Sequence, residues 1–391
     1  MKRSLLTLLL GIGLLESQSL GQEVLRIHDG VGPFDRLSPC SRIEDLDGDG
    51  VDEYLLGVPG GESGGLITAA SGATGLELFR ILGPPDYGRL GSALADAGDF
   101  DGDGVHDIIA GATSDSTNGE SAGRADVFSG ATQALLATSY GFEEFLDYGR
   151  SVAGIGDVDG DGFDDVAVGG ELTYARVLGG PDGHLIRTPN GPPYGSWVSG
   201  RGDVNGDQRP DYLVGWEESS VNGSWTGTVR VYSGATGNVL YAVHGDNPYD
   251  GSKGFDGDHL GYSVAAIGDL DGDAIPDFIA GAPGGSGTLF ANGPGYVRGY
   301  SGATGSVLFT HHGAADDSTL GMGVASGDDV NGDGIPDLLA GAPSETVTIS
   351  GQGAVYCYSQ ATGTSLWKVL GTETAHLLGE YMAILDDLDG D

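Results

Sequence analysis

A nine-residue acidic phrase recurs along the chain and constrains its fold more than any other feature. The first complete copy occupies residues 45–53 and reads Asp-Leu-Asp-Gly-Asp-Gly-Val-Asp-Glu. Further complete copies begin at Asp99, Asp157, Asp203, Asp269 and Asp329, and another begins at Asp387 and stops at Asp391. A recurrence at this spacing predicts an array of similar supersecondary units.

Each repeat has the same order of apolar and turn-forming segments. In the fifth repeat, residues 260–264 precede the acidic phrase, and the apolar run 277–281 begins at the last residue of the phrase. An alternating segment at 295–300 and an apolar segment at 306–310 follow, separated by the turn Ser-Gly-Ala-Thr-Gly at 301–305. These patterns predict four short strands in every repeat.

Four strands per repeat, seven times over, favour an all-β fold, a seven-bladed β-propeller of four-stranded blades. Radial repetition leaves only short, protected sheet edges. A solenoid is the alternative, but its repeats are usually ~20–45 residues long. Residues 23–28 match the last strand of a repeat and 378–382 match the first. We therefore expect both ends of the chain to share a seventh blade, incomplete here, in a domain at 22–391 truncated at its C-terminal end.

The charge of the chain excludes several classes of partner. The 57 acidic and 17 basic residues give a formal net charge of −40. Duplex nucleic acid and anionic membranes bind basic surfaces, so neither is an expected partner. The acidic residues lie in short clusters along the chain, which favours many small cation sites over one acidic tail.

The first residues match a secretory signal peptide, which we place at 1–21. Lys2 and Arg3 precede an apolar run at 5–15 that is too short to span a bilayer. We therefore expect a secreted or cell-surface protein that does not itself insert into a membrane. The two cysteines, Cys40 and Cys357, can pair in an oxidising compartment, and the sequence leaves this open.

The spacing of oxygen-bearing residues in the acidic phrase predicts a Ca²⁺ site in each blade, about six or seven ions in all. Ca²⁺ takes roughly six to eight oxygen ligands in a flexible cage, whereas Mg²⁺ usually keeps several waters and fits less well. The first, third, fifth and ninth residues offer side-chain oxygens and the seventh offers a backbone carbonyl. The candidate ligands are Asp45, Asp47, Asp49, Val51, Glu53, Asp99, Asp101, Asp103, Val105, Asp107, Asp157, Asp159, Asp161, Phe163, Asp165, Asp203, Asn205, Asp207, Arg209, Asp211, Asp269, Asp271, Asp273, Ile275, Asp277, Asp329, Asn331, Asp333, Ile335, Asp337, Asp387, Asp389 and Asp391.

Two other interpretations of the phrase are weaker. An EF-hand needs a bidentate Glu at the twelfth position, which here is apolar in every complete copy, beginning with Leu56 and Ala110. Solvated Asp-Gly turns would explain one such phrase. Complete copies in register with the same flanking strands favour metal binding.

The motifs around the phrase resemble those of the FG-GAP repeat proteins, whose best-known members are the N-terminal propellers of integrin α subunits. A Leu-Gly or Tyr-Gly pair precedes the phrase, as at 148–149 and 320–321, and Gly-Ala-Pro follows it at 281–283 and 341–343. The resemblance covers nearly all of residues 23–391. It implies a seven-bladed propeller with Ca²⁺ held between the first two strands of a blade.

Individual loops depart from the family pattern. Gln208 and Ala274 replace the glycine at the sixth position, which is expected to weaken those loops. Glu53 replaces Asp at the ninth position. Asn205 and Asn331 each remove one charge and are expected to lower affinity for the cation.

Other motifs in the chain carry less weight. The adhesion tripeptide Arg-Gly-Asp at 201–203 ends in the first residue of the fourth acidic phrase, which favours a structural role. Residues 61–65 and 119–123 match Gly-x-Ser-x-Gly but lie between strands rather than in a strand-to-helix turn. His311 and His312 are adjacent, which is poor spacing for two ligands of one ion.

Two functions of different classes follow from this sequence. We favour a Ca²⁺-binding extracellular module for binding or adhesion, without enzymatic activity, monomeric, with an unidentified protein or glycan ligand. Its recognition surface is predicted in the variable loops at 216–227, 246–259 and 284–296, the first of which carries Trp216 and Trp225. The alternative for these loops is that their aromatic side chains only pack the loop itself. The alternative function is a secreted propeller enzyme of the lyase or phosphodiesterase type.

Overall fold

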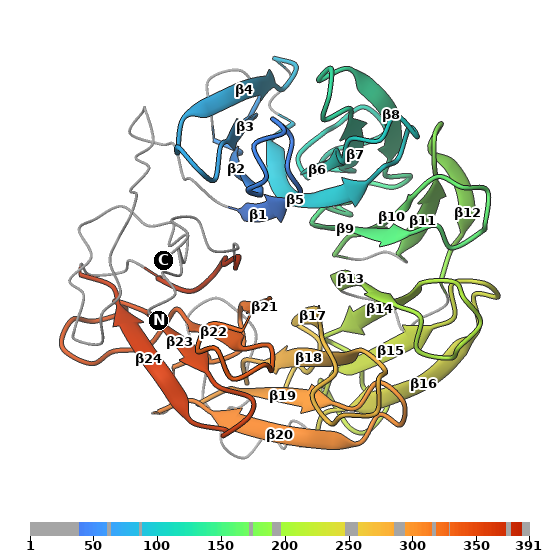
Figure 1. Cartoon of the computed structure of the whole chain (residues 1–391). Coiled ribbons are helices and arrows are strands. Elements are labelled where there is room, and N and C mark those ends of the chain that lie inside the picture. The colour runs from blue at the N-terminus through green and yellow to red at the C-terminus, as the bar shows by residue number, and fades with distance from the viewer. Residues whose placement is uncertain are drawn as a thin grey trace. The chain divides into compact units, whose positions relative to one another are not determined.

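The computed structural model describes residues 39–60, 64–85, 88–171, 175–189, 197–246, 257–284, 294–314, 318–327, 329–372 and 377–384. The regular structure of these residues consists of β-strands in six four-stranded sheets (Figure 1). In every sheet the strands are hydrogen-bonded in chain order, so each strand lies beside the next one in the sequence. Each sheet is one blade of a β-propeller.

The strands are short, as the spacing of turn residues predicts. The first three blades consist of β1 (Cys40–Ile43), β2 (Glu53–Val58), β3 (Leu66–Ala70) and β4 (Glu77–Leu82); β5 (Leu90–Gly98), β6 (Asp107–Ala112), β7 (Arg124–Phe128) and β8 (Leu135–Tyr140); and β9 (Ser151–Gly156), β10 (Asp165–Gly169), β11 (Arg176–Gly179) and β12 (His184–Arg187). The last three consist of β13 (Trp197–Gly202), β14 (Asp211–Trp216), β15 (Thr228–Tyr232) and β16 (Val239–His244); β17 (Ser263–Ile267), β18 (Asp277–Ala282), β19 (Tyr296–Tyr300) and β20 (Val307–His312); and β21 (Val324–Ser326), β22 (Leu338–Ala342), β23 (Ala354–Tyr358) and β24 (Ser365–Leu370).

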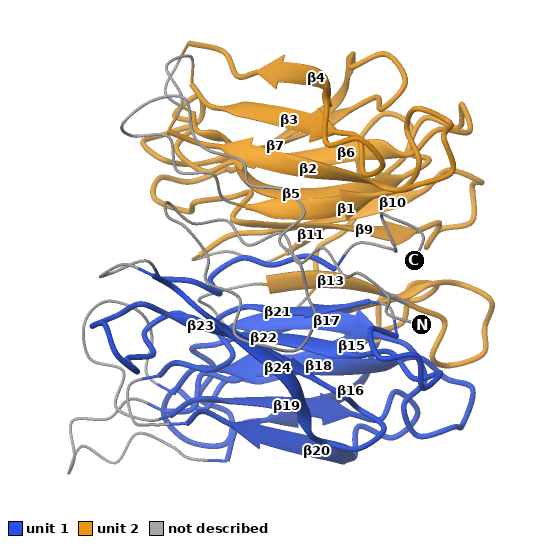
Figure 2. Cartoon of the chain, turned by 60° about the vertical axis from the view of Figure 1, so that its left-hand side comes forward, with its two compact units in different colours: residues 1–27, 213–231, 239–391 blue, residues 28–212, 232–238 orange. Residues whose placement is uncertain are grey.

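The chain divides into two compact units, which are coloured separately in Figure 2. Unit 2 contains residues 28–212 and 232–238, and unit 1 contains residues 1–27, 213–231 and 239–391. The first three blades therefore belong to unit 2, and the fifth and sixth belong to unit 1.

Apolar side chains between neighbouring blades form the core of each unit. In unit 2, Ile43 and Leu55 of the first blade pack with Leu94 and Ile108 of the second. In unit 1, Ile279 of the fifth blade belongs to the same buried cluster as residues of the sixth. Both faces of the inner strands are covered, and all six residues of β6 are buried. This explains why the second strand of each blade is a continuous apolar run instead of an alternating one.

The Leu-Gly or Tyr-Gly pair and the Gly-Ala-Pro motif meet where one blade packs on the next. Gly149 of the third blade has a φ of 91° and lies against Gly111 of the second. A Cβ atom on Gly111 would be 1.8 Å from the carbonyl oxygen of Gly149. The residue before Gly149, Tyr148, is fully buried and forms an isolated parallel bridge with Gly123. The same contact is made by Gly57 with Gly91, by Gly215 with Gly261, by Gly281 with Gly321 and by Gly341 with Gly379.

Most of the predicted strand positions are confirmed, and one is displaced. In the fifth blade β18, β19 and β20 lie where the apolar and alternating segments predict them. The first strand was expected at 260–264 but begins at Ser263. Leu260 instead bridges to Gly227, and Gly261 has a φ of 92°, so these two residues connect blades and cannot continue a strand.

The prediction of seven blades, the last of them incomplete, is wrong, because the described residues form six. Residues 378–382, which were expected to open a seventh blade, lie in the described segment 377–384, which contributes an isolated bridge between Leu378 and Gly353. Leu378 and Ile384 pack with Val355 and Cys357 of the sixth blade. This segment therefore covers the sixth sheet and does not form a sheet of its own. Residues 23–28 lie outside the described residues.

Both cysteines lie in the buried core. Cys40 is in β1 and Cys357 is in β23, and neither forms a disulfide in the described structure. Burial raises the pKa of the Cys40 thiol to about 12, so the reactive thiolate is disfavoured.

Candidate metal centres

Each of the complete acidic phrases forms the loop between the first and second strands of a blade. In the first blade the loop leaves β1 after Ile43 and enters β2 at Glu53, which is the ninth residue of the phrase. The ninth residue also begins the second strand in the next four blades, at Asp107, Asp165, Asp211 and Asp277. The first eight residues thus lie in the turn, and the ninth is part of the sheet.

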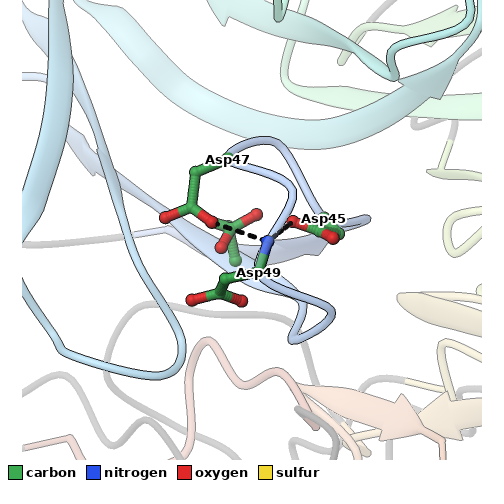
Figure 3. Close-up of side chains that lie close together, drawn as sticks. Asp45, Asp47 and Asp49 are labelled. Carbon is green, nitrogen blue, oxygen red and sulfur yellow. Dashed lines mark hydrogen bonds between the residues drawn. The ribbon is translucent and has the colours of Figure 1, made fainter.

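The side chain of the first Asp of each loop accepts hydrogen bonds from the backbone N–H groups of that loop and so holds the turn. Oδ1 of Asp45 accepts hydrogen bonds from the N–H groups of Gly48 at 2.6 Å and Asp49 at 3.1 Å. Its Oδ2 accepts one from Gly50 at 2.8 Å. Figure 3 shows the carboxylates of Asp45 and Asp47 turned toward the backbone nitrogen of Asp49. Asp203, Asp269 and Asp329 make the corresponding bonds in their loops.

The loops gather carboxylate oxygens closely enough to share one cation. Four groups of acidic side chains have one ligand atom each within 4.8 Å of one another; they are Asp45, Asp47, Asp49 and Glu53; Asp99, Asp101 and Asp107; Asp157, Asp159 and Asp165; and Asp269, Asp271 and Asp273. The fourth and sixth loops have Asn205 and Asn331 at the third position, and in these two described loops no acidic group of this kind is found. The candidate ligands Asp387, Asp389 and Asp391 lie outside the described residues.

The ninth residue is buried and ties the loop to a second turn of the same blade. Oδ2 of Asp165 accepts from the Val158 N–H at 2.8 Å, and Oδ1 accepts from the Gly180 N–H at 3.1 Å. Asp211 repeats this with the N–H groups of Val204 and Gly234, both at 2.9 Å. Asp107 and Asp277 reach the equivalent turns at Gly130 and Gly302. The ninth residue therefore has a structural role beside its predicted role as a ligand.

Burial makes the charged form of these ninth residues unfavourable. Loss of solvation raises the pKa of Glu53, Asp107 and Asp165 to about 7 each, and that of Asp337 to about 6. Repulsion from the other carboxylates of the loop raises it further, as for Glu53 beside Asp47. Oε1 of Glu53 is buried without a hydrogen-bond partner among the described residues, as is Oδ1 of Asp99. Such oxygens are the groups that a bound cation would satisfy.

The raised pKa values predict how the metal-free protein responds to pH. Such a carboxyl has a pKa of about 4 in the unfolded chain and about 7 in the folded protein. It stabilises the fold below pH ~4 and loses that contribution as the pH rises through 7. We therefore expect the metal-free protein to melt at a higher temperature at pH 5 than at pH 8. His106 acts in the same direction, because its hydrogen bond to Asp96 raises its pKa to about 9.

The control for this pH dependence is Asp165→Asn, which removes one of the raised carboxyls and should reduce the difference between the two melting temperatures. His311 opposes the effect. Burial lowers its pKa to about 4, so its contribution to the stability of the fold is lost as the pH falls below 6.5. Scanning calorimetry of protein freed of divalent ions by ion exchange measures the difference. A metal-free protein that melts at a higher temperature at pH 8 than at pH 5 would contradict the interpretation.

The two replaced glycines at the sixth position lie in the left-handed region. Gly50 and Gly162 have φ values of 89° and 95°, and Gln208 and Ala274 have φ values of 69° and 67°. An L-residue in this conformation costs roughly 1–2 kcal/mol. We expect Ala274→Gly to stabilise the fold by about 0.5–1 kcal/mol after the loss of backbone freedom is counted.

Urea denaturation checks this prediction, with Gly162→Ala as the matched opposite change. No atom lies within 4 Å of a Cβ built on Gly162, so its substitution tests the backbone conformation alone. It should destabilise the fold by about 1 kcal/mol. If neither variant shifts the denaturation midpoint, the sixth position carries no strain.

The structure shows the surroundings of the weaker sequence motifs where it describes their residues. The carboxylate of Asp203, in the Arg-Gly-Asp sequence, accepts four backbone hydrogen bonds from its own loop. Ser121 of the second Gly-x-Ser-x-Gly match lies in a turn before β7, and no helix follows it. His311 stacks on Tyr358 with ring centroids 4.0 Å apart. Residues 61–63 lie outside the described residues.

The variable loops are only partly described. Trp216 is fully buried and belongs to the core, whereas Trp225 is 41% exposed in the same loop. Residues 247–256 and 285–293 of the other two loops lie outside the described residues. The sequence analysis missed a second set of exposed aromatic side chains, Phe142 and Phe145, between β8 and β9. Their loop follows Tyr140 and Gly141, and its sequence gave no signal of exposure.

Comparison with known proteins agrees with this geometry. The family model described as FG-GAP repeat matches residues 320–358, which include β21, β22 and β23. The chain is 35% identical to integrin alpha-V of Gallus gallus over 147 residues, which are 36% of this chain and 14% of that protein. It is 31% identical to integrin alpha-4 of Xenopus laevis over 150 residues, which are 34% of this chain and 14% of that protein.

A third relative, integrin alpha pat-2 of Caenorhabditis briggsae, is 38% identical over 109 residues, which are 26% of this chain and 9% of that protein. The matches thus span about one seventh or less of each relative. A search of the described residues for an apolar helix of membrane-spanning length found none. The repeated blades, the Gly-Gly contact between them and these similarities support a β-propeller that is similar to the N-terminal propellers of integrin α subunits and has an FG-GAP repeat at residues 320–358.

Proposed function

We propose that the chain is a Ca²⁺-binding module whose acidic loops each hold one ion. The observation that carries the proposal is the first loop, where Asp45, Asp47, Asp49 and Glu53 bring oxygens within 4.8 Å and one oxygen of the fully buried Glu53 has no partner. The donors are all oxygen atoms, which suits Ca²⁺ better than the softer transition metals. The bound ion neutralises carboxylates that otherwise repel one another.

The ligands would be the first, third, fifth and ninth side chains with the seventh backbone carbonyl. The N–H of the seventh residue donates to the fifth carboxylate in every described loop, for example from Val51 to Asp49 at 2.9 Å and from Ile335 to Asp333 at 3.0 Å. This bond fixes the peptide next to the carbonyl that is offered to the ion. Because this geometry is repeated, we expect the loops with Asn at the third position to bind Ca²⁺ as well, with lower affinity for the ion.

Equilibrium dialysis with radioactive Ca²⁺ tests the proposal directly. We expect close to one ion per acidic loop, with dissociation constants of ~10⁻⁴–10⁻³ M as in other extracellular modules. The double variant Asp47→Ala, Asp49→Ala should lower the number of bound ions by one. Protein that binds no Ca²⁺ at millimolar concentration would rule the proposal out.

We propose further that the module acts in adhesion or another extracellular interaction, without an enzymatic activity of its own, and is exported through its N-terminal segment. Similarity to integrin α subunits supports a protein ligand or partner subunit. Exposed aromatic side chains on rigidly held loops, Phe142, Phe145 and Trp225, are candidate contacts.

Protein and glycan arrays probed with and without Ca²⁺ identify the class of ligand. Binding that needs Ca²⁺ and is weakened by Phe145→Ser supports the proposal. Binding that is unchanged in chelator would separate recognition from the metal loops.

A further inference from the structure

In unit 2 the end of one acidic loop lies on the acidic loop of the preceding blade. Asp164, the eighth residue of the third loop, accepts a hydrogen bond from the Asp99 N–H of the second loop at 2.9 Å. Phe163, the seventh residue, lies over Gly102, where a Cβ atom would be 2.6 Å from its ring. Neighbouring candidate metal sites are therefore in direct contact through their seventh and eighth residues.

The contact between the third and fourth loops differs because it places a positive charge on a candidate ligand. Nη1 of Arg209, the seventh residue of the fourth loop, lies 3.0 Å from Oδ2 of Asp157, the first residue of the third loop. The guanidinium rests on Gly160, where a Cβ atom would be 1.7 Å from Nη2. Glycine at this position thus gives Arg209 the room to reach Asp157.

We propose that Arg209 sets the Ca²⁺ affinity of the third loop, lowering it by binding Asp157 in competition with the ion, so that this site fills at a higher Ca²⁺ concentration than it would without the guanidinium. The inference rests on the proposed Ca²⁺ binding of the loops. It adds that one site is tuned by a side chain from the neighbouring blade.

The electrostatics give the direction of the effect. A guanidinium stays protonated at every physiological pH, so its charge is always present. It reduces the negative potential that attracts a divalent ion to Asp157, Asp159 and Asp161. Arg209 and Asp157 are partly exposed, with 35% and 26% of their side-chain surfaces accessible, so solvent screens the repulsion. Removal of the charge is expected to lower the dissociation constant of the third site roughly five- to tenfold. This figure follows from the repulsion between the two charges of Ca²⁺ and the single charge of the guanidinium at ~6 Å in a largely aqueous setting.

The backbone carbonyl of Arg209, a predicted ligand of the fourth ion, is retained in any substitution of its side chain. Arg209→Gln therefore removes the charge without removing a ligand. Arg209→Lys keeps a positive charge at the same place and should restore most of the wild-type affinity. Arg80→Gln is the matched control, since Arg80 pairs with Glu77 on β4 and its loss changes the net charge equally.

Competition with a chromophoric Ca²⁺ chelator measures the affinities on the full chain. We expect the binding step of the third site, which is the step lost in the variant with Asp159→Ala and Asp161→Ala, to tighten roughly five- to tenfold in Arg209→Gln and to stay in place in Arg209→Lys and Arg80→Gln. The same substitution in a background with Asp159→Ala and Asp161→Ala, where the third site is destroyed, should have no effect.

An unchanged or weaker step in Arg209→Gln would overturn the inference, because a residue that merely supports the loop would lower affinity when removed. A gain that persists in the background without a third site would overturn it as well. If the wild type binds no Ca²⁺ at any step, the proposed function fails and the inference fails with it. Ca²⁺ binding with no response to Arg209→Gln leaves the proposed function intact.

Discussion

Removal of Ca²⁺ by a chelator is expected to lower the melting temperature of this protein by roughly 10 °C or more. An ion that binds the folded chain alone stabilises it by about 1.4 kcal/mol per site at ten times the dissociation constant. Six independent loops would contribute about 8 kcal/mol together, comparable to the whole stability of an ordinary domain. In addition, the ion relieves the repulsion from Asp47, Asp45 and Asp49 that adds to burial in raising the pKa of Glu53.

Scanning calorimetry in 5 mM and in zero free Ca²⁺ measures this effect, with Mg²⁺ at equal ionic strength as the control. A loss that Mg²⁺ largely restores would indicate screening of the net charge of −40 instead of specific ligation. Identical melting with and without Ca²⁺ would contradict both the effect and the function proposed for the loops.

Local sequence patterns were sufficient to predict the blades but not their number. The order of apolar runs and turns placed β18, β19 and β20 correctly, because each depends on a period and a turn within a few residues. The seventh blade was predicted from the seventh acidic phrase and from the strand-like segments at 23–28 and 378–382. A phrase specifies only one loop, and a blade needs four strands that pair; the described segment 377–384 packs on the sixth sheet instead.

The candidate ligands were predicted by position, whereas their unequal environments were not. Spacing identifies the first, third, fifth and ninth residues as one set of oxygen donors. In the structure the first Asp bonds to its own turn near the surface, while Asp165 and Asp211 are fully buried and reach a second turn. The apolar run that follows the ninth residue was a usable signal, since it places that residue at the start of a buried strand.

The contact of Arg209 with Asp157 could not be predicted from the sequence. It joins residues of different repeats, and it depends on how closely one blade packs on the next. Sequence patterns describe neighbours along the chain, so contacts across a blade interface need the fold.

Substitution of Asp211 by Ala is expected to destabilise the fold strongly, even without Ca²⁺. It leaves the N–H groups of Val204 and Gly234 without their acceptor in a fully buried position. Each buried donor without a partner costs roughly 1–3 kcal/mol, so the free energy of unfolding should fall by about 3 kcal/mol or more. Asp211→Asn keeps one acceptor oxygen and should lose about half as much.

Asp207→Ala in the same loop is the matched control for Asp211→Ala, because Asp207 is exposed and bonds to the N–H of Arg209 in its own turn. In metal-free buffer Asp207→Ala should change the free energy of unfolding by less than about 1 kcal/mol, since exposed positions contribute little. In Ca²⁺ it should lose the stabilisation of one site. Urea denaturation of both variants with and without Ca²⁺ therefore separates the two roles of the loop. If Asp211→Ala is no worse than Asp207→Ala in metal-free buffer, the ninth residue does not tie the loop to the second turn, and its burial serves the ion alone.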